Sequence, residues 1–448
     1  MSQGAVPSRE WARRALDVIM QKALDAVDPA EAVRRQLRLV GDQLAVGGRS
    51  YDLSRVGRLV VVGAGKAGAP MVRAVEEILG DRIGDGLVIV KAEHALPTEH
   101  VALVEAGHPI PDRHGLEGAR RIESLISRLR ADDLVLCLIS GGGSALATYP
   151  VEGLALADLQ STTDALLRVG ASINEINAIR KHLERLKGGG LARLAFPAQV
   201  ASLILSDVVG DPLDVIASGP TVPDTTTYAD AWGVLERYGL EAAVPSSVKR
   251  TLQAGLRGEL TETLKPGDPA AETVHHVVVG SNALAADAAA AAAEDEGFNA
   301  LVLTTFLQGE AREVAQVLAA LVKELSQRGG PLATPACLIL GGETTVTVKG
   351  SGKGGRNQEM ALAAAVAIAG MPNVLIGCLA TDGTDGPTDA AGAIVDGDAV
   401  ARAERVGLDP LEYLAENDAY RFLDALDLLL KTGPTRTNVN DLAFVLAW

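Results

Sequence analysis

One pattern repeats along most of the chain: a short run of Leu, Val and Ile, then a turn rich in Gly, Ser or Asp, then an Ala-rich helix. Such runs lie at 59–62, 87–90, 134–139, 201–205, 277–279, 301–303, 337–340 and 374–376. Runs that are apolar on both faces and alternate with helices are typical of mostly parallel sheets covered on both sides. The pattern predicts an α/β fold in which ligands bind at the turns beyond the carboxyl ends of the strands.

The chain is expected to contain two domains, since its 448 residues exceed the size of one ordinary domain. The segment 261–273 is polar and includes Lys265-Pro266-Gly267-Asp268-Pro269, which interrupts helices and strands alike. We therefore expect an N-terminal, Rossmann-like α/β domain over 1–260 and a C-terminal α/β domain over 261–448, each a mostly parallel sheet flanked by helices. The segment 9–46 is expected to be helical and to precede the first strand.

Composition excludes several classes of protein. The chain has 41 Lys and Arg against 57 Asp and Glu, a net charge of −16, which argues against nucleic-acid and membrane-surface partners. Its three cysteines are far apart and form no CxxC pair, so neither a disulfide framework nor a zinc site is indicated. The N-terminus lacks the apolar segment of a secretory signal, and the apolar stretch 362–380 is broken at 370–373. We expect a cytoplasmic enzyme with no membrane span.

Two glycine-rich turns in the first half are candidate anion sites. Gly63-Ala64-Gly65-Lys66-Ala67-Gly68 matches the GxGxxG dinucleotide fingerprint. In a dinucleotide site, an acidic residue at the end of the next strand binds a ribose, but this chain has Lys91 there. The turn with Lys66 is therefore expected to bind an anion other than a dinucleotide. The alternative is a tight turn with a solvated lysine and no ligand. Ser140-Gly141-Gly142-Gly143-Ser144 follows a buried run, which favours a backbone that wraps around an anion over a merely flexible turn.

Carboxylates follow predicted strands in both halves. Asp207 comes after the run 201–205, where it is suited to hold Mg²⁺, to accept a proton or simply to cap a turn. Asp382 and Asp385 follow the strand that ends near Leu379. Their spacing lacks the order of an EF-hand, so magnesium binding or general-base chemistry is favoured over calcium binding.

The second half also carries glycine-rich segments. Gly341-Gly342-Glu343 follows the run 337–340, and the loop 350–355 ends in Arg356 at a predicted helix start. One anion could there be bound by backbone N–H groups, the positive end of a helix and a guanidinium. The alternative interpretation of this segment is a disordered surface loop. The chain contains no GxxxxGK[ST], HRD, DFG, HExxH or GxSxG motif, which argues against P-loop NTPases, protein kinases, zinc proteases and α/β-hydrolases.

Taken together, these turns resemble those of class II glycerate kinases. The matching signatures are GAGKAG at 63–68, AGHPIPD at 106–112, SGGGSAL at 140–146, and the segments 177–192, 205–224, 340–362, 380–396 and 433–442. They extend from about residue 9 to the end of the chain, and the second half resembles the domain called MOFRL. The resemblance implies transfer of the γ-phosphoryl of ATP to the 2-hydroxyl of D-glycerate, with a divalent metal, in a cleft between two α/β domains.

The resemblance also suggests roles for individual residues. Lys66 and Arg356 match the basic site residues and would neutralise the γ-phosphate or the glycerate carboxylate; with Asn357 they are the candidate substrate-binding residues. Asp207 and Asp382 match the acidic positions: one would hold Mg²⁺ and the other accept the hydroxyl proton. Asp385 is a third candidate metal ligand. The candidate phosphate-binding residues are Gly63, Gly65, Ser140, Gly141, Gly142, Gly143, Ser144, Gly341, Gly342, Glu343, Gly354 and Gly355.

Two other functions stay open from the sequence. An NAD(P)H-dependent hydroxypyruvate reductase would use the GxGxxG turn, but no His–carboxylate pair for hydride transfer follows it. A non-catalytic sugar-phosphate sensor would bind the same ligands without turnover. Oligomeric state, monomer or homodimer, is also left open, and the choice of the 2-hydroxyl rests on the resemblance alone.

Overall fold

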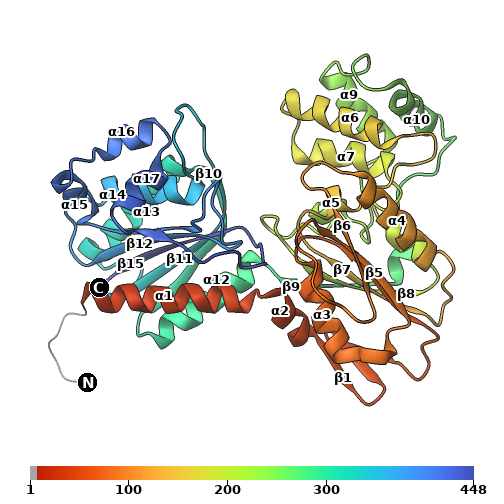
Figure 1. Cartoon of the computed structure of the whole chain (residues 1–448), viewed down its shortest axis with the longest axis horizontal. Coiled ribbons are helices and arrows are strands. Elements are labelled where there is room, and N and C mark those ends of the chain that lie inside the picture. Colours follow the sequence, from red (N-terminus) through yellow and green to blue (C-terminus); the bar gives the residue numbers. More distant parts are fainter. Residues whose placement is uncertain (1–7) are drawn as a thin grey trace. The chain divides into compact units, whose positions relative to one another are not determined.

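The computed structural model describes residues 8–448, which form two compact units (Figure 1). One unit, which we call the Lys66 unit, is Pro29–Val279. The other, the Arg356 unit, combines the segment ending at Asp28 with Gly280–Trp448. Each contains its own sheet and its own hydrophobic core, so the predicted α/β fold with two domains of packed sheet and helices is confirmed.

The main sheet of the Lys66 unit has a Rossmann-like strand order, β6-β5-β4-β7-β8-β9, and its strands from β6 to β8 are parallel. The chain runs outward from β4 to β6 and then returns to β7 on the other side of β4. Loops after β4 and β7 therefore leave the sheet at its switch point, where open α/β sheets bind ligands. The strands are β4 (Leu59–Ala64), β5 (Asp85–Lys91), β6 (Ala102–Ala106), β7 (Leu134–Ile139), β8 (Gln199–Leu205) and β9 (Val274–Gly280).

Helices of the Lys66 unit fall into two groups. The sheet is flanked by α3 (Gly68–Leu79), α4 (Arg113–Ile126) and α8 (Gly190–Ala195), with the short helices η1 (Gly80–Arg82), α5 (Gly143–Leu146), η2 (Ile216–Ser218) and α11 (Pro269–Glu272) in the connections. A separate helical layer has its own core and is seen at one end of the unit in Figure 1. It consists of α6 (Leu156–Arg168), α7 (Ile173–Leu183), α9 (Tyr228–Arg237) and α10 (Ser246–Leu256).

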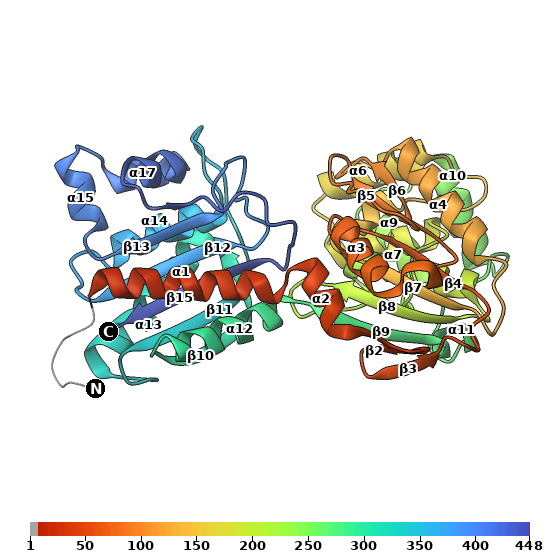
Figure 2. The ribbon, with the colours of Figure 1, turned by 60° about the horizontal axis from the view of Figure 1, so that its bottom comes forward.

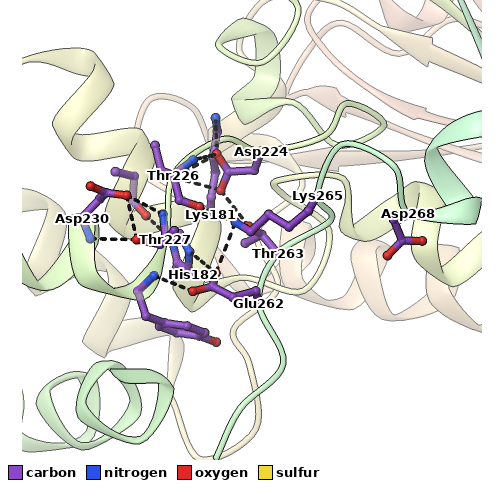
Figure 3. A network of polar contacts seen from close by, with 12 residues as sticks. Lys181, His182, Asp224, Thr226, Thr227, Asp230, Glu262, Thr263, Lys265 and Asp268 are labelled. Carbon is purple, nitrogen blue, oxygen red and sulfur yellow. Dashed lines mark hydrogen bonds and ion pairs between the residues drawn. The ribbon is translucent and has the colours of Figure 1, made fainter. Parts of the chain in front are cut away.

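The boundary between the units lies after Val279 and not at 260/261, where the polar segment suggested it. That segment packs into the Lys66 unit through a polar network (Figure 3). Glu262 accepts a hydrogen bond from the Tyr228 N–H at 3.0 Å and contacts His182 Nε2 at 3.1 Å. Thr263 donates to Asp224 at 2.9 Å, and Asp224 is fully buried beside Lys181 at 3.2 Å. The chain then adds β9 to the edge of the same sheet.

The N-terminal segment differs from the single helical stretch expected over 9–46. The helix α1 (Arg9–Ala26) belongs to the Arg356 unit, where Trp11 stacks on Phe298 with ring centroids 4.6 Å apart. After α2 (Pro29–Gln36), the chain forms an antiparallel sheet of β1 (Leu37–Val40), β2 (Gln43–Val46) and β3 (Arg49–Asp52). Glycines 41 and 47 have φ of +60° and +52°, which suits the turns of this sheet. Figure 2 shows the sheet beside β9.

The sheet of the Arg356 unit is mixed, with the order β10-β11-β15-β12-β13-β14. Its strands are β10 (Asn299–Glu310), β11 (Ala336–Thr345), β12 (Val374–Ala380), β13 (Gly392–Asp396), β14 (Leu429–Leu430) and β15 (Asp441–Ala447). The pair β10–β11 is parallel, whereas β15 inserts between β11 and β12 and runs antiparallel to both. The C-terminal strand thus brings Asp441 between the ends of two strands that carry the predicted site residues.

Helices cover both faces of this sheet (Figure 1). One face is covered by α1 and α12 (Asn282–Asp295), and Leu16 and Met20 of α1 pack against Gly377 of β12. The other face carries the main core with α13 (Ala311–Arg328) and α14 (Arg356–Ala367), together with α15 (Ala399–Arg405), α16 (Pro410–Ala415) and α17 (Ala419–Ala425). Within residues 8–448, no helix is both long and apolar enough to cross a bilayer.

Candidate active site

The two glycine-rich loops at the switch point of the Lys66 unit are bound to each other. The N–H of Lys66 donates to the Gly141 carbonyl at 2.9 Å, and the N–H of Ala67 donates to Ser140 Oγ at 3.1 Å. Gly65 has a φ of +153°, and a Cβ at this position would lie 2.0 Å from Ser140 Oγ. The loop after β4 therefore supports the loop after β7.

Gly63 and Gly65 consequently have packing roles in place of the phosphate-binding role expected from the fingerprint. Gly63 lies inside β4, where a Cβ would stand 2.0 Å from the Leu138 carbonyl oxygen of β7. The N–H of Gly65 donates to Ile89, and that of Gly68 donates to Gly65. The first donors of this turn are thus used within the protein, so the fingerprint offers them to no dinucleotide.

The open donors lie in the loop after β7. The N–H groups of Gly141 and Gly142 have no acceptor in the described part of the chain, and Gly142 has a φ of +82°, which favours glycine. Gly143 donates to the Ser140 carbonyl at 3.3 Å, and Ser144 Oγ pairs with Ser218 Oγ at 2.7 Å. We call the pair Gly141–Gly142 the nest, because adjacent free N–H groups form a concave anion site.

Three side chains from three further loops converge on the nest. A Cβ on Gly141 would lie 2.0 Å from Asp207 Oδ2, and a Cβ on Gly142 would lie 3.1 Å from His108 Nε2 and 3.2 Å from Lys66 Cγ. Lys66 is half-buried, and its ammonium has no acidic partner among residues 8–448. The structure thus brings the predicted Lys66, Asp207 and SGGGS loop together. It adds His108, which the sequence analysis used only as part of the AGHPIPD signature.

Arg356, the first residue of α14, is held by two carboxylates. Its Nε and Nη2 donate to Asp441 at 2.6 and 3.1 Å, and its Nη1 donates to Glu343 at 2.5 Å. Burial acts to lower the pKa of Arg356, but Asp441 and Glu343 outweigh it and the pKa is raised. Burial raises the pKa of Asp441 to about 7, against the lowering effect of Arg356. Arg356 is therefore a fixed cation whose charge is offset by Glu343 and, above the pKa of Asp441, by Asp441 as well.

Asp385 and Asn357 have structural roles that the sequence did not reveal. The Asp385 carboxylate accepts hydrogen bonds from the N–H groups of Asn357 and Gln358 at 3.1 and 2.9 Å, and from their side-chain amides at 3.3 and 3.0 Å. Gly355 makes room for it, since a Cβ there would lie 2.3 Å from Asp385 Cγ. Asp385 thus caps α14 with both carboxylate oxygens already accepting hydrogen bonds, and Asn357 is fully buried.

The glycines of β11 also pack against the protein. Gly341 and Gly342 lie inside the strand, where a Cβ would stand 1.7 Å from Asn282 Oδ1 and 2.1 Å from the Leu307 carbonyl oxygen respectively. Glu343, expected near phosphate, accepts hydrogen bonds from Arg356 and from the Asn440 amide. Glu343 therefore supports Arg356, while Gly341 and Gly342 allow close packing inside the sheet.

Asp382 shares a cavity with Arg356. The cavity has a volume of about 560 Å³ and is lined by Arg356, Asp382, Glu359 and the glycine-rich segment that includes Gly354 and Gly355. Asp382 Oδ1 accepts hydrogen bonds from the Thr384 N–H at 3.0 Å and its hydroxyl at 3.3 Å. Of the predicted residues in this unit, Arg356, Asp382, Asp385, Gly354 and Gly355 thus line the same open volume.

The acidic residues of the candidate site provide few ligands for magnesium. No group of three His, Cys, Asp or Glu side chains suited to a metal occurs between residues 8 and 448. The remaining acidic candidates, Asp207 and Asp382, are single carboxylates. Mg²⁺ commonly binds through one or two carboxylates together with substrate phosphates and waters. The residues therefore fit an ion that arrives with a nucleotide, and they do not form a cage for a resident metal.

Comparisons with known proteins agree with this arrangement. The model of a domain of unknown function, DUF4147, matches residues 15–253, and that of the MOFRL family matches 336–441. The glycerate 2-kinase of Pyrococcus horikoshii is 43% identical, with 96% of each chain covered. A putative hydroxypyruvate reductase of Agrobacterium vitis is also 43% identical, with 87% of each chain covered.

A solved structure gives the same result for the fold. The crystal structure of glycerate kinase from Thermotoga maritima matches 98% of this chain and all of its own, at 44% identity and a TM-score of 0.88. Identity at this level over nearly the whole length, together with both domain matches, means that the chain belongs to the class II glycerate kinase family.

Proposed function

We propose that this chain transfers the γ-phosphoryl group of ATP to the 2-hydroxyl of D-glycerate, giving 2-phosphoglycerate and ADP. The observation that carries the proposal is the nest at the switch point, whose two N–H groups have no acceptor among residues 8–448 and which the Lys66 side chain borders. Phosphoryl transfer depends mainly on positioning and on neutralising charge, and such a site supplies both. The similarity to glycerate 2-kinases over nearly the whole chain supports the same reaction.

In this proposal, Lys66 and the nest hold one anionic group of the substrates. The Lys66 side chain passes Gly142, where a Cβ would lie 3.2 Å from its Cγ, so its ammonium is proposed to add a full positive charge to the two backbone donors. Asp207 lies against Gly141 and is placed to accept the proton of a hydroxyl bound there or to face a metal. No covalent intermediate with the protein is needed.

Arg356 and Asp382 line the other proposed binding volume. The guanidinium is fixed by Asp441 and Glu343, so little conformational entropy is lost when it meets a phosphate. The two carboxylates offset its charge, which favours a ligand that brings its own cation. Mg²⁺ bound with ATP would neutralise phosphate charge, with Asp207 or Asp382 as its protein ligand.

The rival reaction, reduction of hydroxypyruvate with NAD(P)H, has less support. Its fingerprint loop uses the Lys66 and Ala67 N–H groups to hold the loop after β7, so they do not face a pyrophosphate.

We also propose a cytoplasmic protein that works as a monomer or homodimer. The three cysteines, Cys137, Cys337 and Cys378, are free and buried, as is common where thiols stay reduced.

Phosphorus NMR of the product tests the proposal. The purified chain is incubated with MgATP and D-glycerate, and proton-coupled spectra are recorded. Phosphate on C2 is coupled to one carbon-bound proton and gives a doublet, whereas phosphate on C3 is coupled to two and gives a triplet. A new doublet with stoichiometric ADP is expected. A triplet would refute the 2-hydroxyl assignment, and NADH oxidation with hydroxypyruvate without ADP release from ATP and D-glycerate would refute the kinase.

A further inference from the structure

His108 lies at the nest but has no role in the function proposed above. It follows β6 in the loop that leads to α4, and its ring stands over Gly142, where a Cβ would lie 3.0 Å from Cδ2 and 3.1 Å from Nε2. A side chain at position 142 would be tight against the imidazole and strained at the φ of +82° found there, so a glycine suits this approach. The same Gly142 position would contact Lys66 Cγ at 3.2 Å, so the two side chains flank one residue of the nest.

Neither ring nitrogen of His108 has a hydrogen-bond partner in the part of the chain that the structure describes. Three other histidines of the same unit do have partners. His182 contacts the Ala178 carbonyl and Glu262, His276 contacts Thr221, and His94 Nδ1 lies 3.3 Å from the Lys66 carbonyl oxygen. A half-buried imidazole with unused nitrogens beside free N–H groups is suited to meet a ligand.

We infer that His108 contacts the anion bound at the nest, donating an Nε2–H hydrogen bond beside those of Gly141, Gly142 and Lys66. The inference rests on the proposed anion site, and it adds a direct substrate-binding residue to it. The ligand is an oxyanion, and two sources fit: the carboxylate of D-glycerate or a phosphate of the nucleotide.

The electrostatic surroundings support a neutral donor. Burial, helped by the charges of Lys66, Lys91 and His94, lowers the pKa of His108 to about 4. Asp207 is the acidic group that borders the nest, against Gly141. The imidazole is therefore uncharged at neutral pH in the free protein, with one N–H to donate. An anion placed between it and Lys66 removes part of the repulsion and raises the pKa of His108.

The loop after β6 also explains why this residue escaped notice in the sequence. His108 lies between Gly107 and Pro109, within a turn whose glycines and prolines account for the pattern without any ligand. Its place over Gly142 depends on β6 and β7 lying on opposite sides of β4 and β5, with their loops meeting at one edge of the sheet. That arrangement is set by the strand order, which single residues do not encode.

Two measurements on the full-length chain test the inference. The C2–H signal of His108 is followed by NMR against pH, alone and with saturating D-glycerate or ADP. A midpoint near 4 is expected for the free protein, with a rise of one unit or more with one of the two ligands. The ligand that causes the rise identifies the anion. A midpoint that neither ligand moves would refute the contact.

Calorimetry supplies the second readout. Binding of D-glycerate and of ADP is measured for the wild type, His108→Ala, His108→Gln, Lys66→Met and the control His114→Ala, whose imidazole is 78% exposed in the same region. His108→Ala should weaken one ligand about ten- to hundredfold, the worth of a hydrogen bond to a charged group, and His108→Gln should restore part of it. His114→Ala should bind as the wild type does.

The outcomes separate this inference from the proposed function. If Lys66→Met loses binding while His108→Ala keeps wild-type affinity for both ligands, the anion site stands and the role of His108 is refuted. If Lys66→Met binds both ligands as tightly as the wild type, the anion site itself is wrong. Parallel losses in His108→Ala and Lys66→Met for the same ligand support the inference.

Discussion

Replacement of Gly141 by alanine moves one candidate catalytic group without removing any. Gly141 does not have the positive φ of its neighbour Gly142, so alanine is compatible with its backbone, and the N–H of the nest is kept. The new Cβ would stand 2.0 Å from Asp207 Oδ2, whereas ordinary contacts begin near 3.4 Å. The Asp207 carboxylate must therefore move by at least about 1.4 Å, the difference between these two distances.

A displacement of that size is large enough to lower the rate of the reaction. Misplacing a reacting group by about 1 Å can lower a rate about a hundredfold, so kcat of Gly141→Ala should fall at least about a hundredfold. The fold should survive, because the atom in the way is the end of a side chain that can rotate. Overpacking costs about 1–3 kcal/mol, and for a unit of this size each kcal/mol lowers Tm by about 2–4 °C.

The assay is ADP release with D-glycerate, with thermal unfolding of the same preparations. Gly233→Ala is the matched control, since a Cβ there meets nothing within 4 Å and its φ is ordinary. The double variant with Asp207→Ala tests the cause: if Gly141→Ala acts through Asp207, it should have little further effect once that carboxylate is gone. A Gly141→Ala kcat within about threefold of the wild type would show that the position of Asp207 does not matter to the reaction.

Three further predictions concern the Arg356 unit. Arg356→Lys keeps the charge but loses the fork that binds Asp441 and Glu343, so kcat should fall about a thousandfold or more; near-normal turnover in steady-state assays would remove Arg356 from the mechanism. Asp385→Asn leaves the α14 N-terminus without its negative charge, so urea denaturation should show a loss of about 1–2 kcal/mol, and an unchanged midpoint would contradict the cap. The pKa of Asp441, raised by burial to about 7, means that between about pH 4 and 7 the folded chain holds a proton that the unfolded chain has released. Its contribution to stability is therefore lost as pH rises through that window; Asp441→Asn should lose less stability between pH 5 and 8 than the wild type, and equal losses would refute this.

Much of the fold could be predicted because buried strands are apolar on both faces. The runs at 59–62 and 134–139 became β4 and β7, the two strands that define the switch point. The mixed sheet could not be predicted, because the run that forms β15 looks the same whether its neighbours are parallel or antiparallel. The assignment of α1 to the Arg356 unit depends on long-range packing, such as that of Trp11 on Phe298, which no local pattern contains.

The positions of the charged residues of the candidate site could be predicted from the sequence, whereas the roles of its glycines could not. Lys66 and Asp207 do meet at one sheet edge, as residues that follow parallel strands should. A glycine is required both where a ligand approaches the backbone and where another part of the chain packs against it. The sequence therefore could not distinguish the packing glycines Gly63, Gly65 and Gly341 from Gly141 of the nest. Asp382 and Asp385 follow the same strand, and only the placement of α14 shows that the second is a cap.

Single-turnover phosphoryl transfer by Lys66→Met tests the central claim most directly. Methionine keeps much of the shape of the side chain and removes the ammonium of Lys66, which has no acidic partner in the described residues 8–448. With MgATP and excess D-glycerate, the account predicts formation of phosphoglycerate at least about a hundredfold slower than in the wild type, since the charge acts on the transferring group or its acceptor. A wild-type rate in this variant would contradict it.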